Sequence, residues 1–215
     1  GINTQRYVPN EIQRRYVRKV LGAEDGQTVF LLLGWDPVRK GLDIFIKAAA
    51  EVVNETKAHC LFLVIGREKT REFVSRCEIS VVLGHSLRIL DPSSEFSSTL
   101  TGVDVLVSCS RSEAFGYAIA EAMATEKHIL CSEAPGMREI YGGAPGVWFF
   151  PTENWRALAE LMQKASSTAA SDRKRLCHAN RDYIVLRYSL EKWAEKMGQV
   201  YSSLIGNRGS KTYAS

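Results

Sequence analysis

The sequence lacks the patterns that place a protein in a membrane or build it around disulfides or metal ions. No apolar stretch approaches the roughly 20 residues that a membrane-spanning helix needs, and no signal peptide is visible. The five cysteines are scattered, odd in number and never spaced as C-x-x-C, and the four histidines are equally dispersed. These absences argue against a disulfide framework and against a zinc site, and they predict a reducing, cytoplasmic environment.

An excess of charge of one sign is also missing. The 28 basic and 24 acidic residues give a net charge of +4, which is too mild to indicate nucleic-acid binding by itself. The densest basic run, Arg14-Arg15 with Arg18-Lys19, lies in a short amphipathic pattern and is read as a solvated helix face. Hydrophobic residues make up 45% of a chain of 215 residues, which is enough for a sizeable core. We therefore expect a globular protein that binds no nucleic acid.

Short apolar runs alternate with helical patterns from residue 28 onward. Continuous apolar strands with intervening helices predict an α/β fold, a Rossmann-like doubly wound parallel sheet with helices on both faces. The expected strands are 28–34, 59–66, 87–91, 103–110, 128–132 and 146–150, and the expected helices are 11–22, 41–55, 70–77, 94–102, 116–125, 154–165, 171–188 and 189–205. The polar residues 206–215 are expected to fray.

Two cations stand just after the first predicted strand. Gly34 ends this strand, and Arg39 and Lys40 precede the next predicted helix. Backbone N–H groups and the dipole at a helix start attract anions, so the pattern predicts a phosphate pocket. A solvated Arg-Lys pair is the alternative. Gly66, followed by the cations Arg67 and Lys69, repeats the arrangement one strand later, where an ordinary polar loop explains the residues equally well.

The stretch SRSEAFGYAIAEAMA, residues 110–124, places one glutamate on each side of a glycine. Glu113 lies in the loop before a helix expected to begin near Gly116, and Glu121 lies roughly 7–8 Å further along that helix. Gly116 leaves the backbone amides open to an anion, while carboxylates suit sugar hydroxyls. Paired carboxylates about 5–10 Å apart also hydrolyse glycosides. A hydrolase has no use for two cations beside a helix start, so the pattern favours a nucleoside diphosphate that carries a hexose.

Four segments resemble those of the retaining GT-B-fold glycosyltransferases with an E-x7-E motif, the group 1 glycosyl transferases. EAFGYAIAEAMA (113–124) is similar to the family's E-G-F-G-x-x-x-x-E-A-M-A, and LLLGWDPVRKGLDIFIKAA (31–49) is similar to its G-x(5)-K-G-x-D segment. GINTQRYVP (1–9) resembles the G-V-D-T-x-x-F-x-P that follows the interdomain linker, and APGMREI (134–140) resembles G-G-x-x-E-x. Four motifs in the family's order, spread over almost the whole chain, make the resemblance specific.

Three positions depart from the family pattern. Trp35 follows Gly34 where the family usually has arginine, so the basic partner is expected to be Arg39. The turn after the E-x7-E helix reads Thr125-Glu126-Lys127 where the family has Ala-x-Gly, and the segment 134–140 lacks one glycine of the usual pair.

The resemblance implies roles for the candidate residues. Arg39 and Lys40 would neutralise the diphosphate leaving group. Glu121 would bind the ribose hydroxyls, and Glu113 would face the transferred sugar. The other implied donor-binding positions lie at strand ends or at the helix start, and they are Gly34, Gly66, Arg67, Leu90, Phe115, Gly116 and Tyr117. Family members use neither a metal ion nor a cofactor, and their donors are UDP-, GDP- or ADP-linked sugars.

Family members have two Rossmann-like domains, of which the amino-terminal one binds the acceptor. This chain begins where the second domain begins. We therefore expect residues 1–205 to form the donor-binding domain, with 1–27 as the segment after the linker and the first helix, and 154–205 as carboxyl-terminal helices. The acceptor-binding domain would be absent, and the chain alone would not transfer sugar.

The resemblance also implies a pathway and leaves two alternatives open. Bacterial surface polysaccharide or glycolipid synthesis is expected, with the full-length protein associating peripherally with the inner face of the cell membrane. A GT-B-fold nucleotide-sugar epimerase would need a histidine in the cleft, and His85 is the only one near a predicted strand end. A nucleotide-binding module that has lost catalysis is the other alternative, although the intact spacing of Glu113 and Glu121 argues against it.

Overall fold

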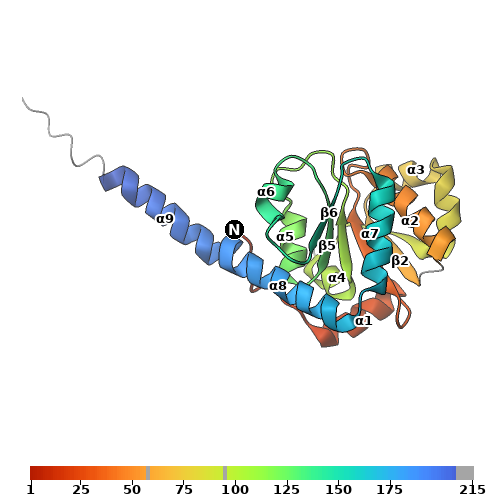
Figure 1. The fold of residues 1–215 in the computed structure, drawn as a ribbon, viewed down its shortest axis with the longest axis horizontal. Coiled ribbons are helices and arrows are strands. Elements are labelled where there is room, and N and C mark those ends of the chain that lie inside the picture. The colour runs from red at the N-terminus through yellow and green to blue at the C-terminus, as the bar shows by residue number, and fades with distance from the viewer. Residues whose placement is uncertain (57–58, 94–95, 207–215) are drawn as a thin grey trace, which may run out of the picture.

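The computed structural model describes residues 1–56, 59–93 and 96–206 (Figure 1). Its six strands form one parallel sheet in the order β3-β2-β1-β4-β5-β6. The strands are β1 (Thr28–Leu33), β2 (Cys60–Ile65), β3 (Leu87–Leu90), β4 (Val105–Ser108), β5 (His128–Ser132) and β6 (Val147–Phe150). This arrangement confirms the predicted doubly wound sheet. The strand order reverses between β1 and β4, the place where open α/β sheets bind ligands at the carboxyl ends of their strands.

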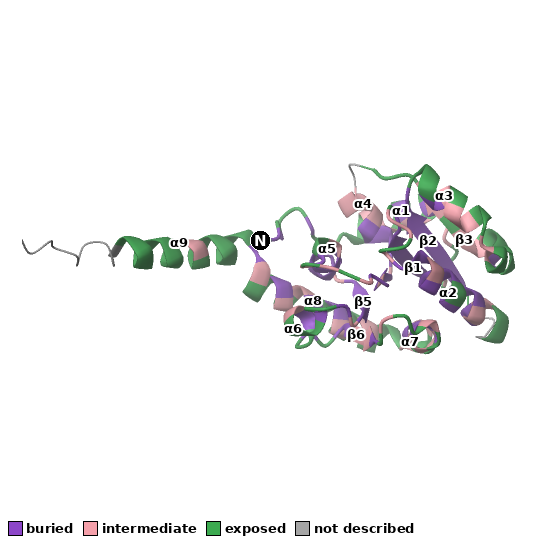
Figure 2. Ribbon diagram, turned by 90° about the horizontal axis from the view of Figure 1, so that it is seen from above, coloured by how far each residue is buried: buried purple, intermediate pink, exposed green. Residues whose placement is uncertain are grey.

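Helices cover both faces of the sheet (Figures 1 and 2). On one face pack α1 (Glu11–Leu21), α4 (Phe96–Gly102), α5 (Tyr117–Ala124), α6 (Met137–Tyr141) and α8 (Ala170–Tyr188). On the other face pack α2 (Leu42–Thr56), α3 (Glu68–Ser75), the three-ten helix η1 (Glu78–Ser86) and α7 (Trp155–Ser167). The last helix, α9 (Leu190–Gly206), extends away from this body. Among the described residues, none of the helices combines the length and the apolar character that a membrane crossing needs.

Alternate side chains of each strand supply the two cores. In β1, Val29, Leu31 and Leu33 pack against the layer that contains α5, whereas Phe30 and Leu32 pack against the layer that contains α2. All five are buried, which is why the strand reads as a continuous apolar run in the sequence. The double burial fixes the sheet between its helices and leaves the strand ends to carry the loops.

The amino-terminal segment is held beside α8. Ile2 pairs with Ser189 in an isolated parallel bridge, and the Arg181 guanidinium donates hydrogen bonds to the carbonyl oxygens of Thr4 and Tyr7. These contacts bring residues 1–9 back across the molecule to the carboxyl end of the sheet. Tyr7 is thereby placed at the site described below.

Two helical elements were not predicted from the sequence. The segment of η1 has no helical period, and Gly84 breaks it with φ 45° and ψ −122°. The helix α6 is only five residues long and follows Gly136, which has φ 83°. Residues 94–95 of the predicted helix 94–102 lie outside the described residues. The frayed tail predicted at 206–215 lies almost wholly outside them too, and Gly206 itself ends α9.

Candidate nucleotide-sugar site

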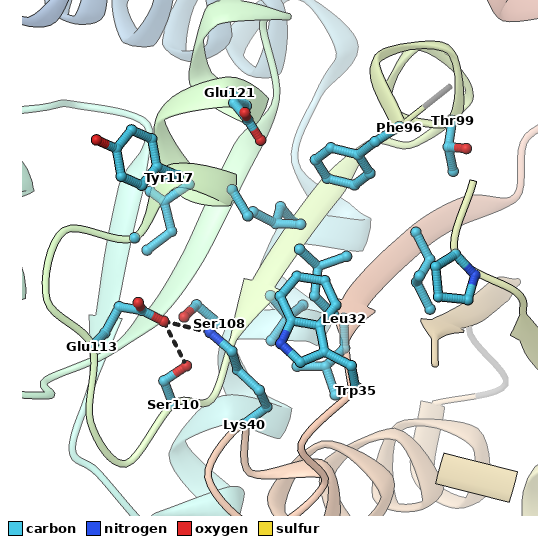
Figure 3. Close-up of a pocket in the computed structure, with 18 of the residues that line it drawn as sticks. Leu32, Trp35, Lys40, Phe96, Thr99, Ser108, Ser110, Glu113, Tyr117 and Glu121 are labelled. Atoms are coloured by element: carbon cyan, nitrogen blue, oxygen red, sulfur yellow. Dashed lines mark hydrogen bonds and ion pairs between the residues drawn. The ribbon is translucent and has the colours of Figure 1, made fainter. Parts of the chain in front are cut away.

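A cavity of about 510 Å³ opens at the carboxyl ends of β1 and β4, where the strand order reverses (Figure 3). Six of the residues predicted from the sequence line it together, namely Arg39, Lys40, Glu113, Gly116, Tyr117 and Glu121. The structure therefore brings both glutamates of the E-x7-E motif and both cations of the loop after β1 into one space.

Lys40 and Glu113 form the central ion pair of the cavity. The Lys40 Nζ lies 2.5 Å from the Glu113 Oε2, and the two side chains are only 13% and 17% exposed. The Ser110 hydroxyl donates a second hydrogen bond of 3.3 Å to the same carboxylate oxygen, as Figure 3 shows. The Lys40 ammonium also stands 5.6 Å from the centre of the Trp35 ring. Because an ammonium has three donors, Lys40 can hold Glu113 and still donate to a ligand.

Gly41 allows the loop after β1 to reach the end of β4. Its φ is +65°, and a Cβ at this position would lie 2.2 Å from the carbonyl oxygen of Cys109. An L side chain is therefore excluded both by backbone conformation and by space. The close approach sets Lys40 opposite Glu113.

Arg111 ties three loops of this edge together. Its guanidinium donates to both carboxylate oxygens of Asp43, at 3.0 and 2.8 Å, and to both of Glu153, at 2.6 and 2.9 Å. It also bonds the Val38 carbonyl, and its backbone N–H donates to the Arg39 carbonyl. The hydrogen bonds that Arg111 donates to Asp43 and then to Glu153 raise its pKa, so its charge is fixed. Burial acts to raise the pKa of Asp43, but Arg111 outweighs it and lowers that pKa.

Arg39 is more exposed than Lys40. Its Nε bonds the Asp36 Oδ2 at 3.0 Å, and both side chains are nearly half exposed. The hydrogen bond from Arg39 lowers the pKa of the Asp36 carboxyl. Arg39 lines the mouth with a solvated ion pair, so it can reorient toward an anion at little cost.

The helix α5 begins at Tyr117, directly after its N-cap Gly116 and close to the predicted start, and Glu113 lies in the loop before it. Gly116 has φ 73° and ψ 56°, in the left-handed region that favours glycine, and no side chain caps the helix start. The Tyr141 hydroxyl donates to the carbonyl oxygens of Phe115 and Gly116, at 2.7 and 3.3 Å. This buried tyrosine holds the backbone in place while the amides of the first turn remain available to an anion.

Glu121 faces the cavity from the second turn of α5 and is bonded by Tyr7. Burial raises the pKa of Glu121, and the Tyr7 hydrogen bond and the charge of Arg6 offset this rise only in part. Burial and the same hydrogen bond raise the pKa of Tyr7 to about 12, so its hydroxyl acts as the donor. A half-buried carboxylate with incomplete compensation accepts further hydrogen bonds readily, and hydroxyl groups supply them.

Five other candidate residues do not line the cavity. Gly34 and Gly66 make room for α3. The Thr70 hydroxyl donates a hydrogen bond of 2.9 Å to the Gly34 carbonyl oxygen. A Cβ on Gly66 would lie 2.1 Å from the oxygen of that hydroxyl. Arg67 is exposed at the start of α3, and Leu90 ends β3. The Phe115 ring packs among tyrosines, 5.5 Å from Tyr188. Their ligand-binding roles stay predictions.

Sequence reasoning missed several residues of the site. Arg111 is a cation after a strand end, the same signal that singled out Arg67, but its partners are 68 and 42 positions away. Tyr7 lies within the resemblance at 1–9, yet no local pattern connects it to Glu121. Phe96 also lines the cavity, and so does Trp35, which stands where the family usually has arginine.

No cluster of three or more metal-ligating side chains occurs in the part of the chain that the structure describes. His85 lies in η1, just before β3, and therefore at the amino edge of the sheet, opposite the cavity. It contributes nothing to this site.

Known proteins share both the sequence pattern and the fold. The model of the family "Glycosyl transferases group 1" matches residues 13–182. The chain is 26% identical over 159 residues to the lipopolysaccharide glucosyltransferase WaaG of Escherichia coli (strain K12), covering 74% of this chain and 42% of that enzyme. It thus spans less than half the length of this curated relative.

Solved structures show the same architecture. The C-terminal domain of LpcC, a glycosyl transferase group 1 family protein from Francisella tularensis, superposes with a TM-score of 0.76 at 18% identity, covering 88% of this chain and 100% of that domain. Anabaena HepE in complex with UDP-glucose superposes with a TM-score of 0.82 at 16% identity, covering 94% of this chain and 56% of that one. The chain therefore belongs to the glycosyl transferases group 1 family and has the fold of one half of a GT-B glycosyltransferase.

Proposed function

We propose that this chain is the donor-binding half of a retaining glycosyltransferase that takes a hexose from a nucleoside diphosphate sugar. One observation carries the proposal: a single cavity collects Lys40, Glu113, the uncapped start of α5 at Gly116, and Glu121. The Lys40 ammonium and the start of α5 can bind phosphate, and the two carboxylates can accept hydrogen bonds from hydroxyl groups. A nucleotide sugar presents these groups in the order hydroxyl, phosphate, hydroxyl.

The diphosphate is assigned to Lys40, Arg39 and the start of α5. Lys40 is held in a partly buried ion pair, so its charge acts through little solvent. Arg39 reaches the same space from the mouth. When the bond between the sugar and the diphosphate breaks, negative charge builds on the leaving phosphate, and these groups stabilise it.

The two glutamates take the two sugars of the donor. Glu121, bonded by Tyr7, accepts hydrogen bonds from the ribose hydroxyls. Glu113 accepts from the hydroxyls of the hexose while it keeps its contact with Lys40. This contact links the hexose to the diphosphate, because the Lys40 ammonium that binds the diphosphate also holds the Glu113 carboxylate that binds the hexose.

Retention follows from attack on the face that the leaving group vacates. The acceptor oxygen forms the new bond to the anomeric carbon, the bond to the diphosphate breaks, and the acceptor's proton passes to the leaving phosphate oxygen. The chain then needs no general base of its own. Its residues orient the donor and stabilise the diphosphate, and the acceptor is bound by a domain outside this chain.

The donor is assigned as a UDP-sugar, and the product as a bacterial surface polysaccharide or glycolipid. The supports are the names of similar proteins: WaaG is a lipopolysaccharide glucosyltransferase, and HepE was solved with UDP-glucose. The reaction would take place in the cytoplasm, with the full-length protein at the inner face of the membrane.

A panel of UDP-, GDP- and ADP-glucose, titrated calorimetrically into the chain, tests the proposal. Saturable binding with preference for the UDP-sugar is expected, and the Lys40→Met variant should bind much more weakly. If none of the three donors binds, the assignment is wrong. Product analysis with the full-length protein separates transfer from epimerisation, and efficient transfer by this chain alone would contradict its role as one half of the enzyme.

A further inference from the structure

A second cavity, of about 570 Å³, lies at the opposite edge of the sheet. Asp104 and Lys127, the residues just before β4 and β5, form its floor at the amino ends of these strands. The helix α1 and the start of α8 supply its walls. None of its lining residues lines the first cavity, so the two spaces are separate.

Cations outnumber carboxylates in this second cavity. Its ionisable lining consists of the cations Arg14, Arg18, Lys127, Arg173 and Lys174, the carboxylates Glu11, Asp104 and Glu126, and the thiol of Cys177. Asp104 already has its partners, because Arg14 lies 2.6 Å, Arg18 3.0 Å and Arg173 3.8 Å from its oxygens. A surplus of positive charge therefore remains after the internal anion has been satisfied.

Two of these cations have donors left over. Lys127 is only 6% exposed, and among the described residues its ammonium makes one long hydrogen bond, 3.4 Å, to the Thr101 carbonyl. Burial, and then the charge of Arg14, lower the pKa of Lys127 to about 8. The Nε of Arg173 is buried and has no hydrogen-bond partner among the described residues. An ammonium has three donors, so Lys127 can donate to a further acceptor in the cavity. The Nε of Arg173 is closed to solvent, but its side chain is 25% exposed and lines the same space, so its terminal nitrogens can reach that acceptor.

The helix start of α8 adds further donors. Ala169 precedes the helix and provides no side-chain cap, and Ala170 lines the cavity. The first N–H groups of a 19-residue helix have no partner within the helix, and its dipole is positive at this end. An uncapped helix start beside buried cations is a favourable place for a phosphate.

We propose that this second cavity binds a phosphate group, held by Lys127, Arg173 and the start of α8. The phosphate of a soluble anion and that of an anionic lipid headgroup share this chemistry.

Inorganic phosphate is the first probe, titrated at constant ionic strength. The titrations use the Lys40→Met chain, which removes the central cation of the first cavity. Saturable binding is expected, and Lys127→Met and Arg173→Gln should each weaken it about tenfold, as the loss of a charged hydrogen bond predicts. Lys47→Met and Arg156→Gln, at exposed positions away from this cavity, should leave it unchanged. Absence of saturable binding, or equal affinity in all variants, overturns the proposal.

Vesicles distinguish the two sources of phosphate. If the chain sediments with phosphatidylglycerol vesicles and free phosphate competes with this binding, the phosphate belongs to a lipid headgroup. If the chain binds free phosphate but not the vesicles, the ligand is a soluble anion. Either result supports the site only if Lys127→Met or Arg173→Gln diminishes it. Should Lys127→Met fail to fold, Arg173→Gln alone decides both experiments. Vesicle binding that survives these variants contradicts the proposal.

Discussion

Replacing Glu121 by glutamine should separate the stability of the empty protein from its affinity for nucleotide. Burial raises the pKa of Glu121 above its ordinary value of 4.5, so the folded protein favours the protonated form. The contribution of this group to stability is therefore present below pH 4.5 and is lost as the pH rises through the raised value. Above this raised pKa the carboxylate is ionised, and the empty fold bears the cost of its burial.

Glutamine keeps the shape of Glu121 and an acceptor for Tyr7, but it carries no charge. The empty Glu121→Gln protein should therefore melt at the same temperature as the wild type or higher at pH 7. Its advantage should shrink as the pH falls toward 4.5. Affinity should change in the opposite direction. A hydrogen bond to a charged group contributes about 1.5–3 kcal/mol and a neutral one about 0.5–1.5 kcal/mol. Across the two ribose hydroxyls the loss is at least about tenfold in affinity.

Thermal melts of the empty protein and calorimetric titrations with UDP measure the two effects on the same samples. Glu160→Gln, an exposed position on α7, is the matched control and should change neither. Unchanged UDP affinity in a well-folded Glu121→Gln protein would refute the assignment of the ribose to this residue. A lower melting temperature at pH 7 would refute the electrostatic reasoning instead.

Three further predictions concern the surroundings of the two cavities. Gly41→Ala should lower the free energy of unfolding, measured in urea, by at least about 1–2 kcal/mol, because the left-handed backbone and the Cys109 carbonyl both exclude a Cβ. An unchanged free energy of unfolding would show that the loop can move away. Arg111→Gln should lower the free energy of unfolding by about 1–3 kcal/mol and weaken UDP binding, because Asp43 loses its charged partner. An unchanged affinity for UDP would show that Arg111 contributes to stability and not to binding. His128→Phe should stabilise the protein by about 1–3 kcal/mol, because both ring nitrogens of His128 are buried without partners among the described residues. Burial lowers the pKa of His128 from 6.5 to about 4, so the stability that its neutral form provides above pH 6.5 is lost as the pH falls toward 4. His128→Phe should flatten the pH dependence of the melting temperature in that window, and an unchanged slope would contradict the reasoning.

The sheet and the loops at its carboxyl edge could be predicted from the sequence because their signals are local. Buried strands such as residues 28–33 appear as unbroken apolar runs, and Gly116 stands between a loop and an alanine-rich helix. Parallel strands place their carboxyl ends at one edge, so Lys40 and Glu113 could be expected near each other although 73 positions separate them. The spacing of the E-x7-E motif therefore corresponds to a real cavity.

Other features depend on contacts that no local pattern encodes. Tyr7 reaches Glu121 only because Arg181, far along the chain, holds the first residues against α8. Arg111 looks like any cation after a strand, and only the tertiary structure shows that it joins Asp43 to Glu153. The strand order, and with it the place where the order reverses, is likewise set by how the layers pack. Short elements such as η1 and α6 could not be predicted for a simpler reason, because they contain too few turns to show a helical period in the sequence.

The most direct test of the account is a crystal structure of this chain with UDP. We predict that the diphosphate lies within hydrogen-bond distance of the Lys40 Nζ and of the backbone amides that follow Gly116, with a ribose hydroxyl on the Glu121 carboxylate. A UDP molecule bound elsewhere, or one in this cavity whose phosphates touch neither Lys40 nor the start of α5, would contradict the account.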